Sequence, residues 1–192
     1  VDHAGPRERR PELPEPDPEE QTSRNLPFYH VPVLLTQVIE LLQPASGKLF
    51  FDGTLGGGGH SEALLQHGAR VVAMDQDPNA LKHAAERLKP YAAQFCALRG
   101  NFRNFPQIVE ETGVSGFDGM LVDIGVSSHQ LDDASRGFSF SKEAPLDMRM
   151  DTDSPRTAAD VVNTADEAEL TRIFFEYGEE PNARRIARAI IK

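Results

Sequence analysis

Four consecutive glycines, Gly56–Gly59, constrain the fold of this chain more than any other stretch of its sequence. They follow an apolar run that ends in Asp52, and they precede the helix-like segment Ser61–Leu65. Glycine is needed where the backbone takes a positive φ or approaches a ligand too closely for a Cβ, and a helix N-terminus offers unpaired N–H groups. The order strand, glycine loop, helix therefore predicts a nucleotide-type cofactor site at the first strand of an α/β sheet.

The spacing of the glycines does not match the dinucleotide-binding pattern G-x-G-x-x-G. Counted from Gly56, the third glycine position holds Ser61, and counted from Gly57 it holds Glu62. A cofactor that needs close backbone approach but carries no phosphate therefore fits better than one with a pyrophosphate. A glycine run can also be a flexible linker, but the strand pattern before it and the helix pattern after it disfavour that interpretation.

Three later stretches repeat the alternation of strand and helix. Val71–Asp75 is an apolar run that ends in a carboxylate, and Asp77 with Pro78 predicts the start of the next helix. Phe95–Leu98 and Phe117–Asp123 predict the third and fourth strands. Strands that alternate with helices predict a parallel sheet with helices on both faces. The helices are expected at residues 34–42, 61–65, 78–88 and 105–111.

Aspartates close three of the predicted strands, namely Asp52, Asp75 and Asp123. In a parallel sheet all three lie along the carboxyl edge, where open α/β sheets bind their ligands. Asp75 follows the glycines by 16 to 19 positions, close to where an acidic residue binds a pair of ribose hydroxyls. Aspartate is also common at strand ends and helix caps, so a purely structural role stays open for each.

Composition excludes several classes of protein. No apolar run approaches the roughly 20 residues of a membrane span, and the single Cys96 excludes a disulfide framework and a cysteine-based zinc site. Residues 1–27 are acidic and rich in proline, which predicts a disordered arm. The net charge of −10 argues against an extended RNA-binding face, so RNA contacts must come from a local patch or from sequence outside the chain.

Six blocks of residues are distinctive, and the three between Gly125 and Asp151 follow no generic periodicity. They are His30–Leu35, Asp52–Ser61, Gly125–Asp133, Arg136–Phe140, Pro145–Asp151 and Tyr177–Glu180. Together these blocks closely resemble the MraW/RsmH family, and the resemblance extends from about His30 to Lys192. That family consists of S-adenosylmethionine-dependent methyltransferases that act on the exocyclic amine of a cytosine in small-subunit ribosomal RNA.

The resemblance implies a Rossmann-like class I methyltransferase sheet, of which the first four strands are present. It implies S-adenosylmethionine as the cofactor, with Asp75 on the ribose hydroxyls and Phe102 against the adenine. It also implies further cofactor contacts from Gly58, Gly59, His60, Asp123 and Gln130, and it requires no metal. Phe102 and Gln130 rest on the resemblance alone, and ordinary core packing for Phe102 or a turn role for Gln130 stays open.

The resemblance further divides the chain into three parts: the arm 1–27, a cofactor-binding domain 28–127, and the start of a helical insertion 128–192 that helps to recognise RNA. In the insertion, Thr164 and Glu167 predict a capping box, and Gly178 ends that helix.

A second helix of the insertion is expected after Pro181. Four residues are expected to point inward, namely Ala183, Ile186, Ala187 and Ile190. The opposite face carries Arg184, Arg185, Arg188 and Lys192, as either a phosphate-binding stripe or a solvated face.

Methyl transfer to a cytosine amine needs help because the nitrogen lone pair is delocalised into the ring. An acceptor must take an N–H hydrogen bond, and the amine must be placed in line. The candidates for that acceptor are Asp123, Ser128 and Asp147. Arg136, Phe138 and Phe140 have the composition of a base-stacking element, but equally that of a small two-stranded core.

The expected partner is small-subunit ribosomal RNA or the assembling small subunit, in a bacterial cytoplasm rather than an organellar matrix. No membrane partner is expected, and a homodimer is left open. We expect the chain to be a C-terminally truncated fragment that does not turn over alone. Two other classes stay open: a non-catalytic ribosome-assembly factor that binds RNA, and a nucleotide-dependent oxidoreductase. The glycine spacing speaks against the oxidoreductase, and the glycine loop with Asp75 speaks against the assembly factor.

Overall fold

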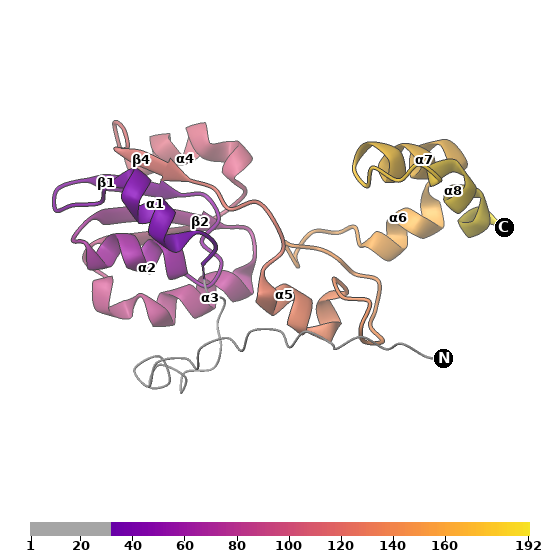
Figure 1. The fold of residues 1–192 in the computed structure, drawn as a ribbon, viewed down its shortest axis with the longest axis horizontal. Helices are drawn as coiled ribbons and strands as arrows, with labels where there is room; N and C mark the ends of the chain where they lie inside the picture. Colours follow the sequence, from indigo (N-terminus) through magenta and orange to yellow (C-terminus); the bar gives the residue numbers. More distant parts are fainter. Residues whose placement is uncertain (1–31) are drawn as a thin grey trace, which may run out of the picture.

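The structure, a computed structural model, describes residues 32–192, so the predicted arm 1–27 lies outside the described residues. A parallel sheet with its helices comes first, and further helices follow it (Figure 1). The sheet region consists of α1 (Leu35–Leu42), β1 (Leu49–Asp52), α2 (Gly59–Gln66), β2 (Arg70–Asp75), α3 (Pro78–Arg87), β3 (Phe95–Arg99), α4 (Phe105–Thr112) and β4 (Gly119–Leu121). The remaining α-helices are α5 (Ser128–Asp132), α6 (Ala158–Thr164), α7 (Glu167–Glu176) and α8 (Ala183–Ile191).

The four strands are parallel and lie in the order β3-β2-β1-β4. The chain builds outward from β1 through β2 to β3, and then crosses to the other side of β1 to form β4. Such a reversal leaves a crevice outside the carboxyl ends of the central strands, where open α/β sheets bind ligands. The predicted parallel α/β sheet is confirmed, and the carboxyl ends of its strands form the edge where a ligand is expected.

Neighbouring residues of β1 bury their side chains in two different cores, because successive side chains of a strand point to opposite faces. Phe50 lies in one core with Leu64 of α2 and Val71 of β2. Phe51 lies in the other core, where its ring meets Phe105 of α4 edge-on at a centroid distance of 4.8 Å. Figure 1 shows α2 and α3 on one side of the sheet and α4 on the other. Both faces are therefore covered, as predicted.

The fourth strand is shorter than predicted and ends at Leu121 instead of Asp123. The N–H of Gly53 still donates to the Leu121 carbonyl at 2.9 Å. The N–H of Asp123, however, donates to the hydroxyl of Thr54 at 2.7 Å. Because this backbone donor bonds a side chain in place of a neighbouring strand, the chain leaves the sheet before it reaches Asp123.

Helices α6, α7 and α8 lie away from the sheet in Figure 1. The predicted capping box at the start of α7 is wrong. Asp166 is the N-cap and accepts from the N–H of Glu169 at 2.8 Å, whereas the Thr164 hydroxyl donates to the Asp160 carbonyl within α6. Thr164 still belongs to the preceding helix, so it cannot cap the next one.

Helix α8 turns its small residues inward. Ala183 and Ala187 are buried, while Ile186 and Ile190 remain 36% and 38% exposed, which corrects the predicted inward face. No helix within residues 32–192 is long and apolar enough to cross a membrane. The domain boundary predicted between residues 127 and 128 coincides with the start of α5 and stays a prediction.

Ser61 supports the turn from β1 into α2 and provides a test of the sheet edge. Its hydroxyl donates to the Asp52 carboxylate at 2.7 Å, and both residues are buried. We expect Ser61→Ala to lower the free energy of unfolding by about 1–3 kcal/mol, because it removes a donor from a buried carboxylate. Urea unfolding measures this loss. Ser115→Ala, at an exposed position, is the matched control and should change it by less than about 0.5 kcal/mol. Equal losses in both variants would contradict the role of this bond.

Candidate active site

A cavity of about 680 Å³ opens at the carboxyl edge of the sheet. Its walls come from the glycine loop, the segments after β2, β3 and β4, the start of α5 and the residue Met150. Volumes of about 300–1,000 Å³ are typical of sites for small ligands and cofactors. The predicted cofactor residues that line this cavity are Gly59, His60, Asp75, Phe102, Asp123 and Gln130.

Two carboxylates hold the glycine loop in place. The buried Asp52 accepts from the N–H of Thr54 at 3.1 Å and from the Ser61 hydroxyl. Asp75 accepts from the N–H of Gly56 at 2.7 Å. Gly56 has a φ of 49°, in the left-handed region that favours glycine. Asp52 therefore supports the loop from inside the fold, while Asp75 fixes it from the neighbouring strand.

Asp75 is shared by the loop and the cavity. One carboxylate oxygen accepts from Gly56, and the other accepts from the N–H of Asp77 at 2.9 Å. Burial raises the pKa of Asp75 above its ordinary value of 3.8, although the hydrogen bonds from Asp77 and Gly56 act in the opposite direction. A carboxylate offers about four lone-pair sites. Asp75 therefore retains acceptor capacity for hydroxyl groups of a ligand in the cavity.

Gly58 and His60, which were predicted together, have different surroundings. Gly58 has a φ of 80° and precedes α2, and a Cβ added there would lie 3.2 Å from Leu88 Cδ1. Gly58 does not line the cavity, because this side of the loop faces the end of α3. His60 does line the cavity, and its Nε2 lies 2.9 Å from the carbonyl oxygen of Val33.

The lining fits S-adenosylmethionine better than a dinucleotide. Two acidic residues, Asp75 and Asp123, line the cavity together with the basic Arg103. A pyrophosphate would meet both carboxylates at short range, whereas a sulfonium cation is attracted by them. The ring of Phe102, partly exposed in the lining, can pack against a base. This chemistry disfavours the nucleotide-dependent oxidoreductase alternative.

Asp123 is the only one of the three predicted acceptors that lines the cavity in the described part of the chain. Ser128 is the first residue of α5 and does not line the cavity, whereas its neighbour Ser127 does. The Asp147 carboxylate is held by the guanidinium of Arg149 at 2.6 Å, which lowers the pKa of Asp147 to about 2. Catalytic roles for Ser128 and Asp147 stay predictions.

Arg136 is buried, which corrects its predicted role in base stacking. Its side chain is 4% exposed, and its guanidinium donates to the Asp77 carboxylate at 2.6 Å. Phe138 lies beside it, with the ring centre 5.9 Å from the guanidinium carbon, whereas Phe140 is fully exposed. The backbone of residues 137–141 forms no strand, so the alternative of a two-stranded core is also wrong. A stacking role remains a prediction for Phe140.

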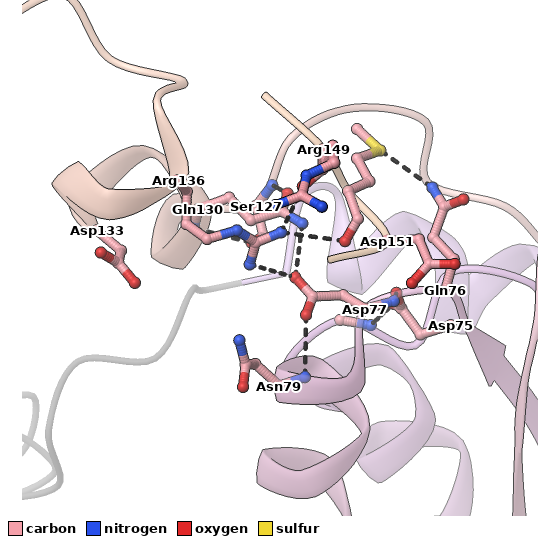
Figure 2. A network of polar contacts seen from close by, with 12 residues as sticks. Asp75, Gln76, Asp77, Asn79, Ser127, Gln130, Asp133, Arg136, Arg149 and Asp151 are labelled. Atoms are coloured by element: carbon pink, nitrogen blue, oxygen red, sulfur yellow. Dashed lines mark hydrogen bonds and ion pairs between the residues drawn. The ribbon is translucent and has the colours of Figure 1, made fainter. Parts of the chain in front are cut away.

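Figure 2 shows a polar network that the sequence did not reveal. Asp77 caps α3 as predicted, by accepting from the N–H of Asn79, and it also accepts from Gln130 and Arg136. Gln130 forms a capping box with Ser127 at the start of α5. Burial alone would raise the pKa of Asp77, but the hydrogen bonds from Arg136 and Gln130 outweigh it and lower the pKa. The Asp-Pro pattern signals only a helix start, because these partners lie 59 and 53 residues away.

Two arginines of the predicted basic stripe on α8 form ion pairs with Glu167 of α7. Arg188 Nε lies 2.8 Å from Glu167 Oε1, and Arg184 Nε lies 3.4 Å from the same oxygen. Exposed pairs of this kind are weak, so a phosphate contact stays a prediction. Within residues 32–192, no group of three or more His, Cys, Asp or Glu is arranged to hold a metal ion.

The fold and the cavity define a Rossmann-like α/β cofactor-binding protein. Residues 27–192 match the MraW methylase family, and the chain belongs to this family. This membership confirms the family, the methyltransferase type of the fold and the cofactor S-adenosylmethionine, all of which were predicted from the sequence.

Two relatives illustrate the match. The protein "Ribosomal RNA small subunit methyltransferase H" of Carboxydothermus hydrogenoformans is 55% identical over 166 residues, which cover 86% of this chain and 53% of the relative. The protein of the same name from Deinococcus radiodurans is 54% identical over 165 residues, which cover 86% and 52%. The chain thus spans about half the length of the curated relatives it matches.

Two solved structures match parts of the chain. An RNA methyltransferase from Salinibacter ruber in complex with S-adenosyl-L-homocysteine is 25% identical, with a TM-score of 0.34 over 38% of this chain and 51% of that one. The C-terminal domain of precorrin-6Y C5,15-methyltransferase from Rhodobacter capsulatus is 16% identical, with a TM-score of 0.42 over 50% of each chain.

Gly58→Ala tests whether the glycine loop faces α3 at this position. Gly58 and Gly113 both have a positive φ, but only a Cβ at Gly58 would meet another side chain within 4 Å. We expect Gly113→Ala to cost about 1–2 kcal/mol of unfolding free energy from backbone strain alone. Gly58→Ala should cost more, because the added methyl group also presses on the buried Leu88. Urea unfolding of both variants measures the difference, and equal losses would contradict this placement of Gly58.

Proposed function

We propose that the whole protein transfers a methyl group from S-adenosylmethionine to the exocyclic N4 amine of a cytosine in small-subunit ribosomal RNA. The observation that carries this proposal is the cavity lined by Asp75, Phe102 and Asp123 in a chain of the MraW methylase family. The names of the relatives support small-subunit ribosomal RNA as the substrate. The N4 position follows from the resemblance of the sequence blocks.

The residues of the chain divide the binding of the cofactor among them. Asp75 accepts hydrogen bonds from the two ribose hydroxyls, and Phe102 packs against the adenine. The acidic lining attracts the sulfonium, since an opposite charge in a partly enclosed site is weakly screened. When bound, S-adenosylmethionine supplies an electrophilic methyl group.

Asp123 is the proposed acceptor for the substrate amine. Its carboxylate takes an N–H hydrogen bond from the cytosine amine, which turns the nitrogen lone pair away from the ring, and it receives the proton that the nitrogen loses. The backbone of Asp123 is tied to Thr54 at 2.7 Å, so the acceptor is anchored to the glycine-loop side of the cavity. Such placement contributes to the rate because the reacting groups are held in line.

We propose that the reaction takes place in the bacterial cytoplasm, on the RNA or on the assembling small subunit. The test is to incubate small-subunit ribosomal RNA or small-subunit particles with the whole protein and S-adenosylmethionine, and to identify the methylated nucleoside by mass spectrometry. N4-methylcytidine is the expected product. Methylation of another nucleoside would overturn the proposed position, and RNA binding without cofactor binding would favour the assembly factor. A homodimer stays a prediction.

Asp75→Ala tests the cofactor side of the cavity. We expect the affinity for S-adenosylhomocysteine to fall about 100-fold or more, because two hydrogen bonds to a charged group are lost. Isothermal titration calorimetry measures the affinity, and circular dichroism checks that the fold persists. Asp153→Ala removes an exposed carboxylate outside the cavity and serves as the control. Unchanged affinity in Asp75→Ala would contradict the placement of the ribose.

The affinity should also fall on acidification, because only the ionised Asp75 accepts from two hydroxyls. Burial raises the pKa of Asp75 above 3.8, so the loss begins at a higher pH than for an exposed aspartate. The stability of the fold has the opposite sign, because a raised pKa means that the folded state binds the proton more tightly. As the pH rises from 3.8 through the raised pKa of Asp75, the free energy of unfolding therefore falls and the affinity for S-adenosylhomocysteine rises.

Asp123→Asn tests the proposed acceptor. We expect the methyl-transfer rate to fall about 100- to 10,000-fold, because an amide cannot take the proton. The affinity for S-adenosylhomocysteine should fall less than in Asp75→Ala, because asparagine keeps the size of the side chain and one acceptor oxygen. Single-turnover methylation of the RNA measures the rate, and Asp132→Asn on the exposed face of α5 is the matched control. A normal rate in Asp123→Asn would remove Asp123 from the mechanism and return attention to Ser128 and Asp147.

A further inference from the structure

The cofactor cavity is not formed by the sheet region alone. Gln130 of α5 and Met150, from the segment before α6, both line it. Gln76, directly after Asp75, donates from Nε2 to the sulfur of Met150 at 3.2 Å and accepts from Asn101 at 2.9 Å. The segment 128–151 therefore supplies one wall of the cavity, and that wall meets the sheet region at the end of β2.

Arg136 fastens this wall to the sheet region. Its Nη1 donates to the Asp77 carboxylate at 2.6 Å, and its Nη2 donates to the carbonyl oxygens of Arg149 at 2.8 Å and Met150 at 3.0 Å. Figure 2 shows the guanidinium of Arg136 close to the Asp77 carboxylate. One side chain thus joins the start of α3 to the backbone that carries Met150.

Three consecutive residues connect this fastening to the cofactor. Asp75 binds the glycine loop and lines the cavity, Gln76 contacts Met150, and Asp77 contacts Arg136 and Gln130. A ligand that orders Asp75 therefore also orders the two residues that hold the wall.

The buried ion pair makes the docking of this wall close to all-or-none. Arg136 and Asp77 are both buried, and a buried charge without its partner is strongly unfavourable. Undocking must therefore expose both charges to water at once. In addition, the Nε of Arg136 is buried and has no hydrogen-bond partner within residues 32–192. That missing hydrogen bond lowers the stability of the docked state. A ligand that stabilises the docked state therefore raises its population by a measurable amount.

On the basis of the proposed function, we propose that Arg136 is a positioning residue that couples cofactor binding to the docking of segment 128–151. It acts through Asp77 and through the carbonyls of Arg149 and Met150. The coupling is reciprocal, because a ligand that favours the docked wall is itself bound more tightly when the wall is docked.

Hydrogen exchange of the whole protein, with and without S-adenosylhomocysteine, tests this coupling in the wild type. We expect the ligand to slow exchange in the glycine loop and also in peptides from residues 133–151. Peptides from α7 and α8 should keep their rates and serve as the internal control, whereas α6 is left out because the N–H groups of Ala158 and Ala159 donate to the carbonyls of Asp147 and Leu146 within the segment. Protection confined to the glycine loop and β2 would overturn the coupling.

Variants of Arg136 then separate positioning from general stability. Arg136→Met should weaken S-adenosylhomocysteine binding by about tenfold or more and abolish the ligand-linked protection of residues 133–151. Arg136→Lys keeps a charge beside Asp77 but lacks the planar fork for two carbonyls, so it should restore part of the affinity. Arg99→Met is the matched control, because Arg99 pairs with Asp151 at the same segment but is 43% exposed and does not line the cavity.

The outcomes distinguish this inference from the proposed function. A wild-type protein that does not bind S-adenosylhomocysteine in calorimetry overturns the proposed function and the coupling with it. A wild type that binds, together with Arg136→Met that binds equally well, overturns the coupling alone. If Arg136→Met loses slow exchange in β1 and β2, that variant is unfolded. The protection pattern of the wild type and the affinity of Arg136→Lys then decide whether the coupling holds.

Discussion

The Asp75 carboxylate joins the first two strand-to-helix turns of the sheet, and the shape of the cavity depends on it. Its two oxygens accept from the backbone of Gly56, after β1, and of Asp77, after β2. Burial raises the pKa of this carboxylate, so its ionised form costs stability at neutral pH. Such a cost is typical of a group whose charge serves a ligand.

Four aspartates near this edge have different roles because their surroundings differ. Asp52 is buried beneath the loop and binds Ser61, so it supports the backbone. Asp77 is neutralised by Arg136 and connects the sheet region to the later segment. Asp75 keeps acceptor capacity inside the cavity, and Asp123 lies exposed at its lining. Burial and hydrogen-bond partners, rather than residue type, therefore divide structural from chemical roles.

The acidic net charge of −10 bears on the RNA substrate of the proposed function. Many arginines of the described part have acidic partners within 4 Å: Arg87, Arg99, Arg136, Arg149, Arg172, Arg184 and Arg188. Because their charges are locally compensated, they attract phosphate less strongly. Within the proposed function, this part of the chain contributes a shaped cavity and exposed rings such as Phe140 more than a positive field.

The sequence by itself determined the features that depend on near neighbours. The glycines Gly56–Gly59 between an apolar run and a helix pattern predicted the loop, and Asp77 before a proline predicted the start of α3. Only the tertiary structure decided the long-range partners. Asp123 lies beyond β4 because Thr54 takes its N–H, and Arg136 is buried because Asp77, 59 residues earlier, neutralises it. Periodicity and capping patterns report local backbone preferences, whereas a buried ion pair depends on which distant residues the fold brings together.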